Sequence, residues 1–157
     1  MNEPPDIGAD AQSVAERVTA VMFARDRASQ ALGMRVTGVR PGWARVAMPV
    51  RADMVNGHGL CHGGLVFALG DSAFAFACNS YNDSTVGAAA TIDFLSAARE
   101  GDELTAEATE LWRTRRNGLY EIVVTNQHGE RIALFRGRSY RVEGQVVDPV
   151  TSAPDRR

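Results

Sequence analysis

The sequence predicts an α+β fold in which a long central helix is wrapped by an antiparallel β-sheet, with an additional N-terminal helix. Nearly every residue from Gly64 to about Asn79 is apolar or small, and a helix that is apolar on all sides is a buried one. Residues 84–142 contain several short alternations of apolar and polar residues, which are typical of antiparallel strands with one solvated face. One buried helix and one long sheet pack best with the sheet around the helix.

Length and composition indicate one domain. The chain has 157 residues and a formal net charge of −2, which argues against a general nucleic-acid binder. We expect the domain over residues 10–143, with 1–9 and 144–157 as flexible termini, because these ends are polar and contain proline. The acidic N-terminus lacks the apolar core of a signal peptide. With only two cysteines, we expect a cytoplasmic protein with free thiols.

The remaining elements follow in chain order. Residues 11–32 carry Val14, Val18 and Val21 at helical spacing, and Gly33 is a plausible terminator. Residues 34–50 predict two strands around the turn "RPGW". The buried helix ends at the turn-forming residues "NSYND". Beyond it we expect a meander of about four antiparallel strands, including a hairpin around "NQHGE".

Two glycines stand at the start of the buried helix, directly after His62. The first N–H groups of a helix have no intrahelical partner and carry the positive end of its dipole. Because Gly63 and Gly64 have no side chains, a ligand can approach these groups, which can polarise a carbonyl and stabilise an oxyanion. The alternative is that both glycines only permit a tight turn and close packing.

Asp71 lies within the apolar run of the same helix. An ionised carboxylate is costly to bury unless it is paired or its pKa is raised. Facing a cleft, such a group is a candidate general base or nucleophile. The alternative is a structural aspartate that binds a backbone N–H or an arginine.

The spacing of these two features limits how they can cooperate. Gly63 and Asp71 are eight residues apart, and hence roughly 12 Å apart along a helix at 1.5 Å per residue. One carbonyl group cannot touch both in the same chain. If they share a substrate, Asp71 comes from a second subunit whose helix runs antiparallel, which predicts an obligate dimer with two equivalent sites at its interface.

The same residues raise three other kinds of site. His58 and His62 have the i, i+4 spacing of zinc ligands, but the glycines around His58 argue against a helix there. Cys61 or Cys78 would need a histidine base to act as a nucleophile, and His62, adjacent to Cys61, is poorly placed to face it. A proton-transferring His62, as in a dehydratase, is the stronger rival.

Three segments of the chain carry a family resemblance. "NGHGLCHGGLVFALGDSAFAFACNS", "TIDFL" and "VVTNQHGERIALFRGRSYR" resemble the hotdog-fold acyl-CoA thioesterases, most of all the PaaI-type phenylacetyl-CoA thioesterases of phenylacetate degradation. The resemblance covers about residues 12–143. It implies a hotdog fold, homodimers with active sites at the interface and usually homotetramers, and hydrolysis of phenylacetyl-CoA or ring-hydroxylated phenylacetyl-CoA.

The resemblance also implies roles for individual residues. Asp71 would act as general base or nucleophile, and the Gly63 N–H, with Gly64, would hold the thioester oxygen from the other subunit. Asn56 matches a position that places the thioester or the water, and His62 lies beside the site. No cofactor and no metal are required, because a thioester is already activated and water is the second substrate.

Contacts to the phosphates of CoA are expected from arginines near the end of the sheet. The substrate-binding candidates are Arg136 and Arg138, with Arg141 beside them, or else the group Arg113, Arg115 and Arg116. The alternative is that they only solvate a strand face. After "TIDFL" the family commonly has a basic residue and then proline, where this chain has Ser96-Ala97. The rival functions are a non-catalytic acyl-CoA-binding module and a hotdog hydratase or dehydratase.

Overall fold

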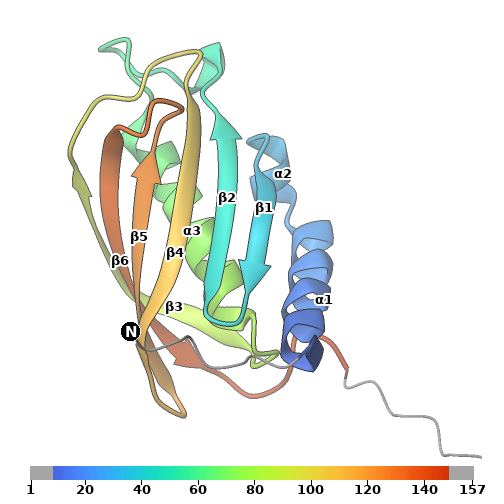
Figure 1. The fold of residues 1–157 in the computed structure, drawn as a ribbon. Coiled ribbons are helices and arrows are strands. Elements are labelled where there is room, and N and C mark those ends of the chain that lie inside the picture. The colour runs from blue at the N-terminus through green and yellow to red at the C-terminus, as the bar shows by residue number, and fades with distance from the viewer. Residues whose placement is uncertain (1–8, 149–157) are drawn as a thin grey trace, which may run out of the picture.

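The structure is a computed structural model that describes residues 9–148. A six-stranded antiparallel sheet curves around helix α3 (Gly63–Asn79), and α1 (Ala9–Arg25) and α2 (Arg27–Ala31) lie beside one edge of the sheet (Figure 1). The predicted α+β architecture with a wrapped central helix is confirmed. Among the described residues, no helix is both long enough and apolar enough to cross a membrane.

The strand order of the sheet is β1-β2-β4-β5-β6-β3. The strands are β1 (Arg35–Arg40), β2 (Trp43–Pro49), β3 (Thr85–Phe94), β4 (Glu103–Arg113), β5 (Asn117–Thr125) and β6 (Arg131–Arg141), and a 3₁₀ turn, η1 (Ala52–Met54), precedes α3. The hairpins around "RPGW" and "NQHGE" are confirmed.

The predicted meander is wrong for β3, which pairs with β6 and not with the strand that follows it. The chain crosses from β3 to β4 through residues 95–102, which are held beside the start of α3. In this linker, the Ala98 carbonyl accepts from the Cys61 N–H at 2.8 Å and the Asp102 carbonyl from the Val50 N–H at 2.8 Å. The linker delivers β4 to β2, so β3 is left as an edge strand with exposed faces.

The helix predicted over residues 11–32 is interrupted at Asp26. The Asp26 carboxylate accepts from the Ser29 N–H at 2.9 Å and from the Ser29 hydroxyl, so it caps α2 instead of continuing α1. Gly33 follows α2 with φ of +71° and ends the helix as predicted.

Aromatic rings pack directly onto the backbone where α3 meets the sheet. The Phe74 ring lies against Gly137 of β6, where an added Cβ would stand 2.8 Å from ring atoms, and also against Gly87 of β3. On the helix itself, Gly70 leaves room for the Phe135 ring, which a Cβ there would approach to 3.1 Å. These glycines bring helix and strands closer than side chains would allow.

Only one side of α3 is covered by the sheet, so the expectation of burial on all sides is wrong. A stripe along the other side is exposed or half-buried, and it consists of Gly64, Ala68, Asp71 and Ala75. These positions recur at helical spacing and so share one face. The physical reason is that a single curved sheet encloses a helix from one side only.

The expected flexible termini fall mostly outside the described residues. Within the predicted segment 144–157, residues 144–148 are described, and the Asn82 side chain holds Val147 there. Its amide group donates to the Val147 carbonyl and its oxygen accepts from the Val147 N–H, both at 2.9 Å.

The packing of Phe74 on Gly137 leads to a stability prediction. We expect Gly137→Ala to lower the free energy of unfolding by about 1–3 kcal/mol, because the new methyl group would overlap a fully buried ring. Urea denaturation followed by circular dichroism measures this. Gly57→Ala is the matched control, since a Cβ there meets nothing within 4 Å. An equal effect of both substitutions would contradict the packing argument.

Candidate active site

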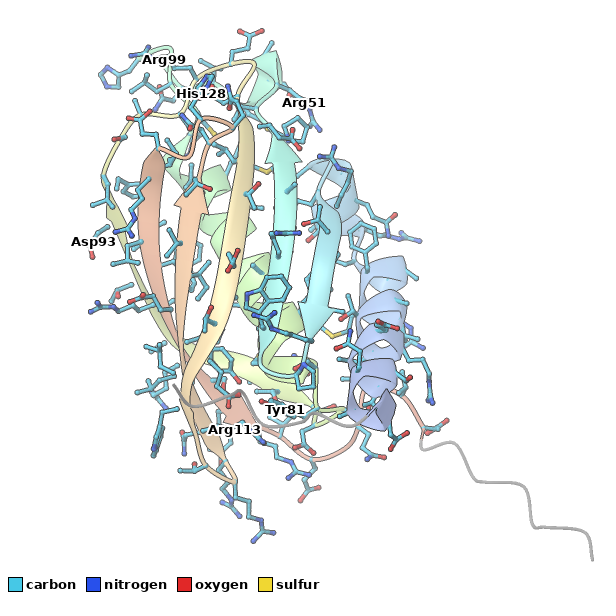
Figure 2. The ribbon with its side chains drawn as sticks, viewed as in Figure 1. Arg51, Tyr81, Asp93, Arg99, Arg113 and His128 are labelled. Carbon is cyan, nitrogen blue, oxygen red and sulfur yellow. The ribbon has the colours of Figure 1, made fainter. Side chains whose placement is uncertain are left out.

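The two ends of α3 have different surroundings. Arg51, Arg99 and His128 lie in loops at the end of the molecule where α3 begins (Figure 2). Tyr81 and Arg113 lie at the opposite end, where α3 stops. At the latter end the Arg113 guanidinium stacks over the Tyr81 ring, 3.8 Å from its centre. The sequence-predicted site residues Asn56, His62, Gly63 and Gly64 all belong to the first end.

His62 is the N-cap of α3. Its Nδ1 accepts a hydrogen bond from the Gly64 N–H at 3.0 Å, and its own N–H donates to the Met54 carbonyl at 2.8 Å. The Gly64 N–H is therefore occupied, although the resemblance gave it a share in holding the thioester oxygen. In the structure, the His62 ring shapes the start of the helix.

The Gly63 N–H has no hydrogen-bond partner among the described residues, and Gly63 lines a cavity of about 350 Å³. Other lining residues are Asn56, Leu60, Val66, Phe94 and Ile132, so the walls are mostly apolar. An unpaired N–H at the positive end of a helix, in a residue that lines an apolar cavity, can donate to a carbonyl oxygen and stabilise negative charge on it. The structure thus places Gly63 and Asn56 at the same cavity.

Asn56 organises the loop that leads to α3. Its Oδ1 accepts from the N–H groups of His58 at 2.9 Å and Leu60 at 3.2 Å. Asn126 makes the same turn in the β5–β6 hairpin, accepting from the N–H groups of His128 and Glu130.

The two turns differ in what the asparagine side-chain nitrogen meets. Asn126 donates its Nδ2 hydrogen to Glu130 at 3.2 Å, but the equivalent fifth residue of the first turn is Leu60. No described residue accepts from the Asn56 Nδ2. Because Asn56 lines the cavity, its amide is a second donor available to a ligand beside Gly63.

Asp71 does not line this cavity. It lies on the exposed stripe of α3, so the prediction of a buried carboxylate is wrong for the single chain. No described residue pairs with it. Partial burial against the helix surface nonetheless raises the pKa of the Asp71 carboxyl above its ordinary value. The eight-residue spacing keeps it roughly 12 Å from Gly63 along the helix.

Arg136 and Arg138 lie on the outer face of the sheet, away from α3, and neither lines the cavity beside Gly63. The Arg136 guanidinium is 3.5 Å from the Glu121 carboxylate, and Arg138 donates to the Asn117 side-chain oxygen at 3.4 Å. The structure does not bring them together with the helix start in one chain.

The geometry supports neither a cysteine nucleophile nor a zinc site among the described residues. Burial raises the pKa of the Cys61 thiol, and that of Cys78 to about 12, so neither is an activated nucleophile at neutral pH. The His62 ring binds Gly64 instead of either sulfur. No three His, Cys, Asp or Glu side chains in the described part of the chain are grouped to hold a metal ion.

Phe94 is a site residue that sequence reasoning missed. The residue is 56% exposed, and its ring lies over Gly63, where a Cβ would stand 3.0 Å from the ring. Next to it, Leu95, Ser96 and Ala97 line the same cavity. The signal in the sequence was "TIDFL" itself, which ends in two large apolar residues at the end of a strand.

A central helix wrapped by an antiparallel sheet, with a donor-bearing helix start beside an apolar cavity, is the architecture of the hotdog-fold class. The family model described as Thioesterase superfamily matches residues 58–133. The Escherichia coli acyl-coenzyme A thioesterase PaaI is 44% identical over 126 residues, which are 80% of this chain and 90% of that protein. The chain belongs to the thioesterase superfamily.

Other similar proteins agree with this assignment. A putative esterase from Archaeoglobus fulgidus is 36% identical over 127 residues, covering 81% of this chain and 82% of its own length. The solved structure of PaaI, from the phenylacetic acid degradation operon of E. coli, matches with a TM-score of 0.85 at 41% identity. That match covers 86% of this chain and 98% of the other.

The capping hydrogen bond of His62 can be tested by substitution. We expect His62→Ala to lower the free energy of unfolding by about 1 kcal/mol, because the Gly64 N–H loses its acceptor. His62→Asn, which supplies a good N-cap acceptor, should restore most of it. Thermal denaturation measures both. Unchanged stability of His62→Ala, together with loss of catalysis, would instead favour a proton-transfer role.

Proposed function

We propose that the protein hydrolyses phenylacetyl-CoA, or ring-hydroxylated phenylacetyl-CoA, to the free acid and CoA. The observation that carries the proposal is the unpaired Gly63 N–H at the start of α3, opening on an apolar cavity next to the Asn56 amide. The E. coli relative is an acyl-coenzyme A thioesterase, and it comes from the phenylacetic acid degradation operon of that organism.

The proposed active site lies between two subunits. The edge strand β3 is exposed on both faces, and such an edge is a template for pairing with another chain. Pairing two copies antiparallel through β3 would bring the exposed stripes of their α3 helices side by side. Asp71 of the partner subunit would then lie near Gly63, and its carboxylate would lose more water.

The proposed chemistry is one hydrolytic addition and elimination. The thioester carbonyl oxygen accepts from the Gly63 N–H and the Asn56 amide, which stabilise the charge that develops on it. Asp71 of the partner subunit takes a proton from water as the water oxygen bonds to the carbonyl carbon. The carbon–sulfur bond then breaks and the CoA thiolate leaves. In the alternative route the carboxylate attacks that carbon itself, and, after the thiolate has left, water hydrolyses the mixed anhydride to the free acid and restores Asp71.

The acyl group is inferred from the walls of the cavity. Leu60, Val66 and Ile132 provide apolar surface, and the exposed Phe94 ring can stack on a phenyl group. Phe74 and Phe76 of α3 do not take part, because both are fully buried in the core.

Assembly and location extend the same proposal. Exposed apolar side chains at the β4–β5 end of the sheet, Leu111, Trp112 and Leu119, support a second interface and hence a homotetramer. The free thiols Cys61 and Cys78 are buried, which fits a reducing compartment, and we place the enzyme in the cytoplasm.

Replacing the carboxylate tests the mechanism. We expect Asp71→Asn to lower kcat/KM for phenylacetyl-CoA by about 10³-fold, because the amide can neither accept a proton nor attack the carbonyl. Release of free thiol measures it, and size-exclusion chromatography should show the same oligomer. Asp10→Asn, on α1, is the matched control. Substantial activity in Asp71→Asn would overturn the assignment.

The pH profile gives the same mechanism a second readout. Because burial raises the pKa of Asp71 and the base must be ionised, activity should fall as pH drops through a value above the ordinary 3.8.

A mixed dimer tests whether the site spans two subunits. Gly63→Val alone should be inactive, because the valine side chain covers the helix start beneath Phe94. Randomly mixed with Asp71→Asn, it should regain about a quarter of the wild-type activity, since half of the dimers then have one intact site of two. No recovery in refolded mixtures that contain heterodimers would contradict a shared site.

A further inference from the structure

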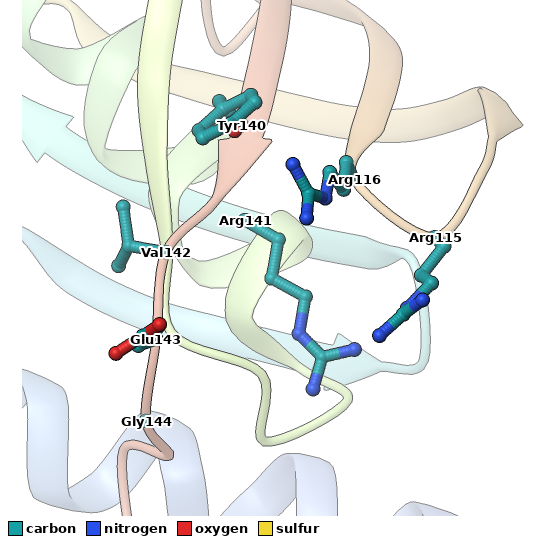
Figure 3. Close-up of a pocket in the computed structure, with 7 residues that line it drawn as sticks. All are labelled: Arg115, Arg116, Tyr140, Arg141, Val142, Glu143 and Gly144. Carbon is teal, nitrogen blue, oxygen red and sulfur yellow. The ribbon is translucent and has the colours of Figure 1, made fainter.

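At the end of the molecule opposite Gly63, three arginines surround one cavity. It has a volume of about 600 Å³ and is lined by Arg115, Arg116, Tyr140, Arg141, Val142 and Glu143, with Gly144. Figure 3 shows Arg115 and Arg116 reaching from the β4–β5 hairpin toward the end of β6, with Glu143 on the other side of that segment. For a chain with a net charge of −2, this is a local concentration of positive charge.

The backbone holds these arginines in place. Arg115 and Arg116 occupy the centre of a turn closed by the hydrogen bond from the Thr114 N–H to the Asn117 carbonyl, at 2.7 Å. The Arg141 N–H donates to the Arg116 carbonyl at 2.8 Å, which fastens the turn to β6.

The three guanidinium groups are not equally neutralised. The Arg141 side chain is paired with Asp83 at 2.7 Å. Arg115 and Arg116 have no carboxylate partner among the described residues. Both are exposed, and their guanidinium groups are therefore available to an anion, most favourably a phosphate, which accepts hydrogen bonds from them bidentately.

Two contacts fix the position of this cavity relative to α3. The Asn79 side chain, at the end of α3, clamps Thr85 through two hydrogen bonds of 2.9 Å, and Thr85 pairs with Arg141. The arginine cavity thus lies at the C-terminal end of the helix. Asn79 is eight residues beyond Asp71, or roughly 12 Å along the axis.

In a dimer whose α3 helices run antiparallel, that spacing would place the arginines of one subunit within reach of Gly63 of the other. If Asp71 of one subunit lies beside Gly63 of the other, the C-terminal end of the first helix extends roughly 12 Å past Gly63. The arginines of the first subunit are then separated from the reacting carbonyl by a span that a pantetheine arm can cover. Within one chain they are separated by the length of β3, nine residues or roughly 30 Å.

We propose that Arg115 and Arg116, with Arg141, bind the phosphates of the 3′-phosphoadenosine diphosphate end of CoA, whose thioester lies against Gly63 of the other subunit. This inference rests on the proposed thioesterase function and its two-subunit site. Tyr140, which lines the cavity and is 38% exposed, offers a ring on which the adenine can stack.

Substrates with and without the nucleotide test the proposal. We expect Arg115→Ala/Arg116→Ala to raise KM for phenylacetyl-CoA by about ten- to a hundredfold, from the loss of charge-assisted hydrogen bonds. The kcat should stay within about twofold, since no reacting group changes. KM for phenylacetyl-pantetheine, which lacks the nucleotide, should not change. Arg25→Ala/Arg27→Ala, which removes the same charge at the α1–α2 junction, should leave both KM values unchanged.

The outcomes separate this inference from the function on which it rests. An unchanged KM for phenylacetyl-CoA in the double variant, or an equal rise for phenylacetyl-pantetheine, would overturn the arginine site while leaving the thioesterase intact. If the wild type released no thiol from either thioester, the proposed function would fail instead. Calorimetric titration with free CoA then decides the arginine site directly, since weaker binding by the double variant supports it and equal binding overturns it.

Discussion

The rings of Phe74 and Phe135 pack onto backbone at Gly137, Gly87 and Gly70, and the position of α3 depends on this contact. It presses the helix into the sheet from one side and leaves no room for it to turn or slide without a clash. The helix start and Asp71 are consequently presented at a fixed separation on the open side. The packing of the core therefore sets the positions of the helix start and of Asp71.

Much of the fold could be predicted because its signals are local. The apolar run 64–79 and the glycine-containing turns report on residues within a few positions of one another, and so does periodicity in strands. The break at Asp26 was also local, since aspartate followed three residues later by Ser29 can cap a new helix. The place of β3 was not predictable, because alternation tells which face of a strand is wet and not which strand lies beside it.

The candidate site could likewise be predicted only where its signals are local. The glycines after His62 indicated an open helix start, and Gly63 provides it, but the rotamer that ties the His62 ring to Gly64 depends on the surrounding loop. The sequence predicts a buried Asp71 because its neighbours are apolar or small, and composition alone does not tell which side of a helix lies against the sheet. The exposed ring of Phe94 has the same ambiguity.

The two edge strands of the sheet, β1 and β3, differ in what lies beside them. Along β1, the α1 side chain Gln12 donates to the Val39 carbonyl at 2.9 Å, and α1 lies beside that strand (Figure 1). This leaves β3 as the edge open to another chain. A two-fold pairing through β3 consumes that edge in both copies, and the far edges it leaves are both capped by helix. Such an assembly would be self-limiting along the sheet, because α1 would cover the one edge that remains in each copy.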